Sequence, residues 1–260
     1  MKKHVLDLKV VENVRFHDRY CLLKLTSDKR LPEMLPGQFV QVKVTGSEKT
    51  FLRRPISINY VNKERNELWL LIQIVGPGTQ KMAQYVSGDI VNTIVPLGNG
   101  FTVPQSVTDL KILLVGGGVG TAPILFMGKI LKEMYFNLVF LLGGRTKNDI
   151  MQMDEFQKLG TVYVTTEDGS KGEKGFVTNH STLLVSREFG KIYACGPKPM
   201  MEAVAKYAKD RNIDCEVSLE NMMACGIGAC LCCVEKTVKG NVCVCTEGPV
   251  FNINQLTWQI

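Results

Sequence analysis

Residues 220–233 read Glu220-Asn-Met-Met-Ala-Cys225-Gly-Ile-Gly-Ala-Cys230-Leu-Cys232-Cys233, and this stretch decides how the C-terminal part of the chain folds. It holds four of the nine cysteines, and more cysteines follow downstream. Cys225, Cys230 and Cys233 have the C-x4-C-x2-C spacing with which plant-type sites hold a [2Fe–2S] cluster through four thiolates. The stretch therefore predicts a small [2Fe–2S] domain at residues 213–260.

The glycines of this stretch fit a loop around a cluster. Such a loop must point backbone N–H groups at the inorganic sulfides, and Gly226 and Gly228 can adopt the positive φ angles that this requires. The fourth ligand is open at this point, because Cys243 and Cys245 are both available. Cys232 lies between two expected ligands, and we expect it to point away from the cluster.

Three other kinds of cysteine site compete with this interpretation. Structural zinc usually takes two C-x2-C pairs, and Cys230/Cys233 is the one clean pair here. A disulfide framework is disfavoured, because the first residues lack the apolar core of a secretory signal and the chain has a large apolar fraction. Single cysteines can also be inert buried thiols. The spacing favours the iron–sulfur site.

The composition is that of an ordinary globular protein with room for two domains and a small appendage. The 260 residues are 45% hydrophobic and 22% charged, with a net charge of +6. Basic and acidic residues are interspersed, so nucleic-acid binding has little support. The uncharged stretch at residues 112–128 is interrupted by glycines and a proline, so we expect no membrane span. We expect a reduced, cytoplasmic compartment.

The N-terminal part, residues 1–103, is expected to form an antiparallel six-stranded β-barrel. Short segments rich in Val, Ile, Leu and aromatic residues alternate there with turn residues such as Pro36-Gly37 and Ser87-Gly88. The expected strands are residues 5–15, 20–26, 38–44, 56–61, 67–75 and 89–95. One helix is expected, at residues 79–85.

Two motifs inside this barrel point to an anionic ligand. Arg53-Arg54-Pro-Ile-Ser57 places guanidinium groups, which suit bidentate phosphate binding, and a hydroxyl at the start of a strand. Gly76-Pro-Gly-Thr79 opens the helix, and a helix N-terminus can bind an anion. A solvated strand end and a plain turn are the ordinary alternatives. The separation of the motifs permits one phosphate clamp across adjacent strands.

From residue 104 onward strands and helices alternate, which predicts a doubly wound parallel α/β sheet over residues 104–212. Pro123 lies in the first turn of the first helix, where proline is tolerated. The expected strands are residues 111–115, 138–142, 162–165, 191–194 and 215–219. The expected helices are residues 122–135, 151–159 and 199–211.

Two glycine turns follow strands of this sheet. Gly116-Gly-Gly-Val-Gly-Thr121 departs from the dinucleotide fingerprint, because Thr121 replaces its last glycine and Arg145 stands where an acid is usual. A glycine-rich loop can also serve close strand–helix packing. Cys195-Gly-Pro197 ends a later strand, and two such turns at the carboxyl edge of one sheet form a ligand crevice.

Taken together, Arg-x-x-Ser on a barrel strand, Gly-Gly-Gly-x-Gly-Thr-Ala-Pro and Cys-Gly-Pro resemble the ferredoxin–NADP reductase superfamily, which joins an FAD barrel to an NAD(P) domain. The cysteine stretch, Thr166-Glu-Asp-Gly-Ser170 and the ending Cys245-Thr-Glu-Gly-Pro-Val-Phe251 narrow the resemblance. They are similar to the electron-transfer subunits of two-subunit, NAD-dependent dihydroorotate dehydrogenases. This resemblance covers essentially the whole chain.

The resemblance implies three cofactors. The last cysteine of the family's cluster motif directly precedes an x-acid-Gly-Pro-Val-Phe ending, which matches Cys245 and leaves Cys243 as the spare. The implied [2Fe–2S] ligands are Cys225, Cys230, Cys233 and Cys245. The implied FAD contacts are Arg54, Pro55, Ile56, Ser57, Leu71, Ile72, Gln73, Gly78 and Thr79. The residues expected at NAD(H) are those of the two turns: Gly116, Gly117, Gly118, Gly120, Thr121, Cys195, Gly196 and Pro197. The choice between NADH and NADPH stays open, because Arg145 could bind the 2′-phosphate of NADPH.

By the same resemblance, the chain carries electrons and leaves the substrate chemistry to a partner. Hydride passes between NAD(H) and FAD, and the flavin exchanges single electrons with the cluster. The cluster serves the FMN of a catalytic subunit that oxidises dihydroorotate to orotate in pyrimidine biosynthesis, in a heterotetramer with two of each chain. We expect no catalytic base here, because His4, His17 and His180 are isolated.

Two other functions use the same features. An NAD(P)H:ferredoxin oxidoreductase or a sulfide dehydrogenase-like complex would carry the same FAD, NAD(P) and cluster motifs with a different partner, because the deciding site lies on another protein. A zinc-stabilised or redox-sensing binding protein is a rival of a different class. It leaves the six-stranded barrel and the two glycine turns unexplained.

Overall fold

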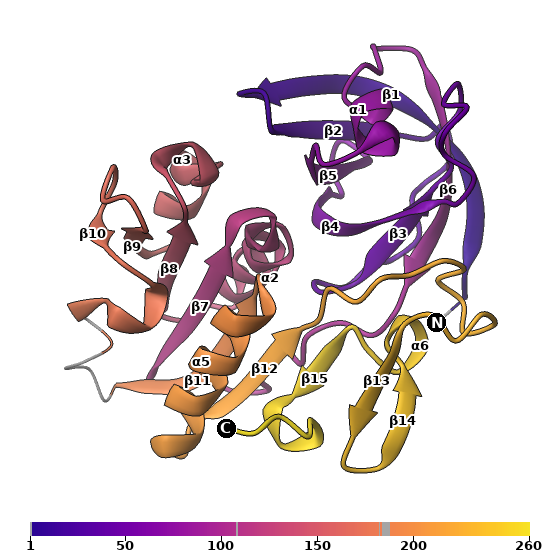
Figure 1. The fold of residues 1–260 in the computed structure, drawn as a ribbon. Coiled ribbons are helices and arrows are strands. Elements are labelled where there is room, and N and C mark those ends of the chain that lie inside the picture. The colour runs from indigo at the N-terminus through magenta and orange to yellow at the C-terminus, as the bar shows by residue number, and fades with distance from the viewer. Residues whose placement is uncertain (1, 108, 182, 184–187) are drawn as a thin grey trace. The chain divides into compact units, whose positions relative to one another are not determined.

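The computed structural model of the chain describes residues 2–107, 109–181, 183 and 188–260 (Figure 1). It divides the chain into two compact units. The first unit comprises Met1–Gly100, Asn221–Glu235 and Val242–Pro249, and the second comprises Phe101–Glu220, Lys236–Asn241 and Val250–Ile260. Most of the cysteine stretch thus belongs to the barrel's unit. The three-domain division at residues 1–103, 104–212 and 213–260 stays a prediction.

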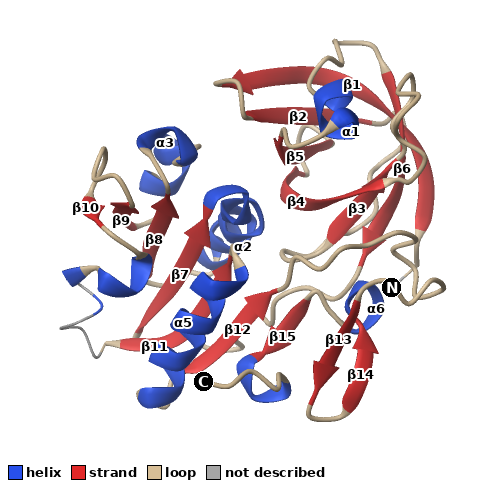
Figure 2. Cartoon of the chain, in the orientation of Figure 1, coloured by secondary structure: helices blue, strands red, loops and turns tan. Residues whose placement is uncertain are grey.

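The first unit is built on a closed barrel with the strand order β1-β2-β5-β4-β3-β6 (Figure 2). All pairs in this barrel are antiparallel. The strands are β1 (His4–Phe16), β2 (Tyr20–Thr26), β3 (Phe39–Val42), β4 (Arg54–Asn62), β5 (Glu67–Gln73) and β6 (Ile90–Leu97). Each lies where the sequence predicts a strand, because β-branched, leucine and aromatic side chains suit a half-buried pleated surface. Leu23, Leu25, Ile58, Leu68 and Leu70 are fully buried.

The helix of the barrel, α1 (Pro77–Met82), begins and ends earlier than the predicted range of residues 79–85. Gly76 is its N-cap, and Pro77 occupies the first position, where the missing N–H is not needed. The Thr79 hydroxyl accepts the Gly76 N–H at 3.1 Å and the Val75 N–H at 2.9 Å. These hydrogen bonds start the helix two residues before the prediction.

The second unit contains a seven-stranded sheet with the order β10-β9-β8-β7-β11-β12-β15. Its strands are β7 (Lys111–Gly117), β8 (Leu138–Gly144), β9 (Thr161–Thr166), β10 (Glu173–Lys174), β11 (Phe189–Cys195), β12 (Asp214–Ser218) and β15 (Val250–Asn252). The pairs from β10 to β12 are parallel, as predicted. β15, which the sequence did not predict, pairs antiparallel with β12. The strand order reverses between β7 and β11, which is where open α/β sheets bind ligands.

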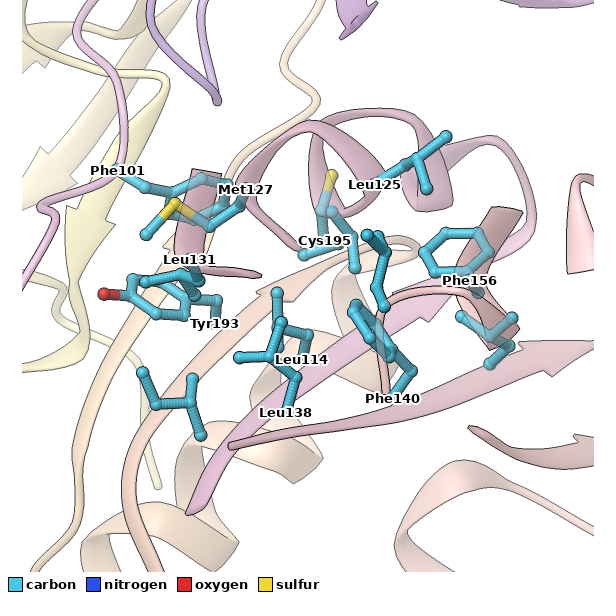
Figure 3. Packing of buried hydrophobic residues seen from close by; sticks show 14 of the residues in the cluster. Phe101, Leu114, Leu125, Met127, Leu131, Leu138, Phe140, Phe156, Tyr193 and Cys195 are labelled. Carbon is cyan, nitrogen blue, oxygen red and sulfur yellow. The ribbon is translucent and has the colours of Figure 1, made fainter. Parts of the chain in front are cut away.

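Helices cover this sheet: α2 (Thr121–Glu133), α3 (Met153–Gln157) and α5 (Lys198–Asp210), with 3-10 turns η1 (Gly118–Gly120), η2 (Lys147–Asp149), η3 (Val177–Asn179) and η4 (Ile253–Gln255). In the view of Figure 1, α5 crosses in front of β11 and β12. Figure 3 shows the core, where Met127 and Leu131 of α2 pack with Tyr193 of β11. Phe140 and Phe156 meet edge to face, with ring centroids 5.2 Å apart.

The C-terminal part adds a hairpin of β13 (Val234–Thr237) and β14 (Gly240–Cys243) and the single-turn helix α6 (Val244–Glu247). Val250 of β15 is buried in the core of the second unit. Among the described residues, no helix has the length and apolar character needed to cross a membrane.

Candidate cofactor sites

The two barrel motifs expected to contact an anion meet in the first unit. Arg54 begins β4, and its Nη1 donates to the Leu52 carbonyl at 2.9 Å. A Cβ added to Gly78 of α1 would lie 2.9 Å from Arg54 Nε and 3.1 Å from Thr50 Cγ2. The missing side chain of Gly78 thus lets the guanidinium lie against α1. Arg54 and Gly78 are brought together by tertiary structure, since they lie on separate elements.

The remaining barrel residues expected at FAD lie on two strands. Ser57 pairs with Phe39, and Pro55 pairs with Gln41, both across β3 and β4. On β5, the side chains of Leu71 and Ile72 are buried. β5 pairs with β2 along its whole length but with β4 only from Glu67 to Leu70, counting the described strands. The backbone of residues 71–73 on the β4 side is therefore the part of β5 that a ligand could meet.

Both glycine turns lie at the reversal point of the second unit. Gly116 of β7 pairs with Cys195 of β11. A Cβ on Gly120 would lie 2.5 Å from the Cys195 carbonyl oxygen, and a Cβ on Gly117 would lie 2.6 Å from Met200 Sδ. Close packing against backbone atoms therefore requires glycine at position 120, whereas a Cβ at position 117 would press on the side chains of Met200 and Pro197. Gly118 is different, because its φ of 54° is the left-handed conformation that glycine favours. The two turns form one edge, as the sequence predicted.

A thiol and a carboxylate meet at the same edge. Cys195 Sγ lies 3.9 Å from Oε1 of Glu220, which the sequence analysis did not single out. Cys195 is buried, and although Glu220 as a whole residue is exposed, burial of its carboxyl group raises the pKa of that carboxyl. Burial, and then the negative charge of Glu220, raise the pKa of the Cys195 thiol well above its usual value. The thiol is therefore neutral at physiological pH. The one sequence signal was the position of Glu220, directly after a predicted strand.

In the first unit, residues 225–233 and 243–248, called the cysteine loop below, direct backbone N–H groups at their thiols. Cys225 Sγ accepts from Ile227 at 3.4 Å and from Ala229 at 3.3 Å. Cys245 Sγ accepts from Gly228 at 3.2 Å. Burial acts to raise the pKa of Cys225, but the N–H donors outweigh it and lower that pKa to about 6. These N–H groups thus stabilise the thiolate of Cys225, which is the form that binds iron, whereas burial and the neighbouring Cys233 raise the pKa of Cys245 to about 12.

The other cysteines of the loop differ in exposure. Cys233 and Cys245 are buried, Cys230 and Cys232 are exposed, and Cys243 is half-buried. The Cys245 N–H donates to Cys233 Sγ at 3.4 Å, which joins the two buried cysteines. Burial and the nearby thiols of Cys233, Cys225 and Cys230 raise the pKa of Cys243, so Cys243 also lies near this group. In the described part of the chain, no three His, Cys, Asp or Glu side chains gather closely enough to hold a single metal ion.

The cysteine loop is attached to the barrel by hydrogen bonds that follow β6. Asn99 Nδ2 donates to the carbonyls of Thr246 at 3.1 Å and Glu247 at 2.9 Å. The backbone N–H of Asn99 donates to the Gly248 carbonyl at 2.6 Å. The cysteine loop and the barrel are accordingly parts of one compact unit.

Family models match two parts of the chain. The model described as the iron–sulfur cluster binding domain of dihydroorotate dehydrogenase B matches residues 220–257. The model described as the oxidoreductase NAD-binding domain matches residues 114–206. The two matches cover the cysteine loop and the sheet with its glycine turns.

Solved structures with similar folds extend over the barrel and the sheet. An NADH-dependent reduced ferredoxin-NADP oxidoreductase, studied for flavin-based electron bifurcation, has a TM-score of 0.83 and 29% identity, covering 96% of this chain and 90% of that chain. An Amycolatopsis cytochrome P450 reductase has a TM-score of 0.70 and 23% identity, covering 81% of this chain and 67% of that chain. The second likeness shows the fold alone. The predicted fold class, a barrel with an α/β sheet and an iron–sulfur segment, is confirmed.

Curated relatives cover most of the chain. The "Dihydroorotate dehydrogenase B (NAD(+)), electron transfer subunit" of Lysinibacillus sphaericus is 42% identical over 84% of this chain and 86% of its own length. The protein of the same name from Fusobacterium nucleatum is 37% identical over 94% of this chain and 95% of its own length. The chain therefore belongs to the family of electron transfer subunits of dihydroorotate dehydrogenase B (NAD(+)).

Proposed function

We propose that this chain passes electrons between NAD(H), FAD and a [2Fe–2S] cluster, and to and from the FMN of a dihydroorotate dehydrogenase catalytic subunit in pyrimidine biosynthesis. It is an oxidoreductase subunit, and FAD, the cluster and NAD(H) are its cofactors, as predicted. The observation that carries the proposal is the cysteine loop, which turns backbone N–H groups toward thiols within the barrel's own unit. When bound, the flavin supplies the conversion between two-electron and one-electron transfer.

The proposed cluster ligands are Cys225, Cys230, Cys233 and Cys245. The N–H groups of Ile227, Ala229 and Gly228 support Cys225 and Cys245, because hydrogen bonds to sulfur stabilise the ligand thiolates. For the fourth position we propose Cys245, which is buried and accepts an N–H from the cysteine loop, with Cys243 as the spare.

The proposed FAD site uses the Arg54 guanidinium for phosphate, together with the backbone of residues 71–73 and α1. Arg54 supports this role because its side chain lies against Gly78 and presents a fork of donors. The proposed NAD(H) site is the edge formed by the two glycine turns, where Gly118 and Gly196 have positive φ angles. These residues bind and orient the cofactors; none is proposed to act on dihydroorotate.

The proposed partner is an FMN-containing catalytic subunit, in a heterotetramer with two of each chain in the cytoplasm. The names of the relatives support a partner, since each is called a subunit. The ferredoxin-linked alternative has support in the 29% identical neighbour, which is named a ferredoxin-NADP oxidoreductase. The experiment must therefore separate the two partners.

We would express the chain with and without a dihydroorotate dehydrogenase catalytic subunit and follow NADH formation after adding dihydroorotate. We expect activity only with both chains. Activity should disappear in Cys230→Ala and persist in Cys232→Ala, an exposed cysteine two residues away. A visible spectrum of flavin and cluster without dihydroorotate-dependent NADH, but with NAD(P)H-dependent ferredoxin reduction, would replace this proposal with the ferredoxin alternative.

A further inference from the structure

Gln41 of β3 is a buried glutamine of the first unit whose side-chain amide has no hydrogen-bond partner among the described residues. Its side chain is 0% exposed, and neither Oε1 nor Nε2 is hydrogen-bonded. Its backbone is held by the barrel, because Gln41 pairs with Pro55 and Ile94 and its carbonyl accepts from Arg53 Nη1 at 3.2 Å. Burying an amide without a partner is unfavourable, so native proteins almost always provide one.

The Gln41 side chain lies against the cysteine loop. A Cβ added to Gly226 would lie 2.7 Å from Gln41 Cγ, 2.7 Å from Nε2 and 3.1 Å from Cδ. Gly226 directly follows Cys225, and Gly228 donates its N–H to Cys245 Sγ. The unpartnered amide is thus placed beside the same turn that supplies N–H donors to the thiols.

We propose that Gln41 is a positioning residue for the iron–sulfur cluster: its Nε2–H group donates to sulfur at the loop of Cys225–Cys230 and so raises the reduction potential of the cluster. This inference rests on the proposed function, because it needs the cluster in this loop. Hydrogen bonds to sulfur favour the more negative, reduced cluster. A primary amide supplies such a donor without adding a net charge.

The chain offers a matched control in Gln38, a second buried glutamine, which precedes β3. Gln38 Oε1 accepts the Leu35 N–H at 2.7 Å, and Gln38 Nε2 donates to the Gly98 carbonyl at 2.8 Å. Its amide is therefore satisfied by the barrel. Gln38→Met and Gln41→Met each remove one amide and keep the side-chain length. The two variants separate a loss of buried hydrogen bonding from an effect on the cluster.

The first measurement is an EPR-monitored redox titration of the holoprotein and the two variants. For Gln41→Met we expect the reduction equilibrium of the cluster to shift about tenfold toward the oxidised form, which is about 59 mV for one electron. For Gln38→Met we expect a lower unfolding temperature and an unchanged cluster potential. A Gln41→Met cluster with the potential and EPR spectrum of the wild type overturns the inference.

A second measurement does not depend on the variant folding. In protein with glutamine labelled by 15N at the side-chain amide only, pulsed EPR of the reduced cluster should detect a 15N coupling in the wild type and in Gln38→Met. The coupling should vanish in Gln41→Met. A wild-type cluster without this coupling overturns the role of Gln41 and leaves the proposed function intact. A wild-type chain that assembles no cluster refutes the proposed function, and this inference with it.

Discussion

At the scale of single residues, Gly226 carries two separate requirements. Its φ of 70° is left-handed, and a Cβ there would lie 2.7 Å from the Gln41 side chain. Gly240 has a φ of 105°, but a Cβ there would meet no atom within 4 Å. The two glycines therefore separate backbone strain from steric conflict.

We predict that Gly226→Ala lowers the free energy of unfolding by about 1–3 kcal/mol more than Gly240→Ala does, because overpacking adds to the backbone strain. Iron and acid-labile sulfide per chain, with the unfolding temperature, measure the difference. In the Gln41→Ala background part of the Gly226→Ala loss should be recovered, since the conflicting side chain is gone. Equal losses in the two single variants would contradict the packing argument.

Gly78 offers a parallel test at the FAD site. A Cβ there would lie 2.9 Å from Arg54 Nε, whereas a Cβ on the neighbouring Gly76 would meet nothing within 4 Å. We predict that Gly78→Ala displaces the guanidinium and weakens FAD binding about tenfold, which corresponds to about 1.4 kcal/mol. Gly76→Ala should bind FAD like the wild type. Titration of the apoprotein with FAD, followed by flavin fluorescence, measures both affinities. If Gly78→Ala bound FAD with unchanged affinity, Arg54 would not be a residue of the FAD site.

The iron–sulfur segment, which a family model matches at residues 220–257, could be predicted from the sequence because its signal is local. The spacing of Cys225, Cys230 and Cys233 is the pattern expected of cluster ligands along one loop, and it can be recognised without the fold. Gln41 and Asn99 gave no such signal, because each meets the cysteine loop only through the barrel. Their sequence surroundings are those of ordinary strand and turn residues.

At the scale of elements, the two turns of the α/β sheet depend on each other. Gly120 stands at the end of η1, and a Cβ there would lie 2.5 Å from the Cys195 carbonyl that ends β11. The three nearest atoms, the carbonyl oxygen and carbon of Cys195 and Cα of Gly196, all belong to the backbone, so they cannot move aside as a flexible side chain can. The two turns therefore keep their shape only together.

We predict that Gly120→Ala lowers the stability of the second unit by roughly 2 kcal/mol and weakens NADH binding, because the turn must move away from β11. Gly175→Ala is the control for backbone strain without steric conflict, since its φ is 129° and a Cβ there would meet nothing closer than 3.8 Å, whereas Gly120 has a φ of −62° and only the steric conflict. Thermal unfolding and NADH titration measure the two effects. If Gly120→Ala bound NADH as tightly as the wild type, the turn at Gly120 would not be part of the nucleotide site.

The elements that the sequence missed are short or depend on distant partners. β15 has three residues and exists because β12 offers an open edge, which no local pattern announces. The start of α1 was misplaced because Gly76-Pro77-Gly78 is typical of a turn, while the Thr79 hydroxyl converts it into a helix start. The long strands and α2 were predicted because their apolar patterns are strong.

At the scale of the whole molecule, the barrel and the cysteine loop share one unit, so the cluster should stabilise the barrel. We predict that removing iron by chelation lowers the protection of β3 and β6 from hydrogen exchange. Gln41, which lies on β3, and Asn99, which follows β6, are the residues that contact the cysteine loop. Protection in β7 and β8 of the second unit should stay the same. Exchange measured by mass spectrometry on protein with and without cluster tests this. Equal loss in both units would contradict the division into units.

Residues 213–260 change unit between residues 220 and 221, between 235 and 236, between 241 and 242, and between 249 and 250. A segment interleaved in this way cannot be exchanged between homologues as a cassette. A chimera that takes residues 213–260 from one parent contains a segment that packs against Gln41 and Asn99 of that parent, while its barrel comes from the other parent. Viable recombinants should therefore transfer these barrel positions together with the C-terminal segment.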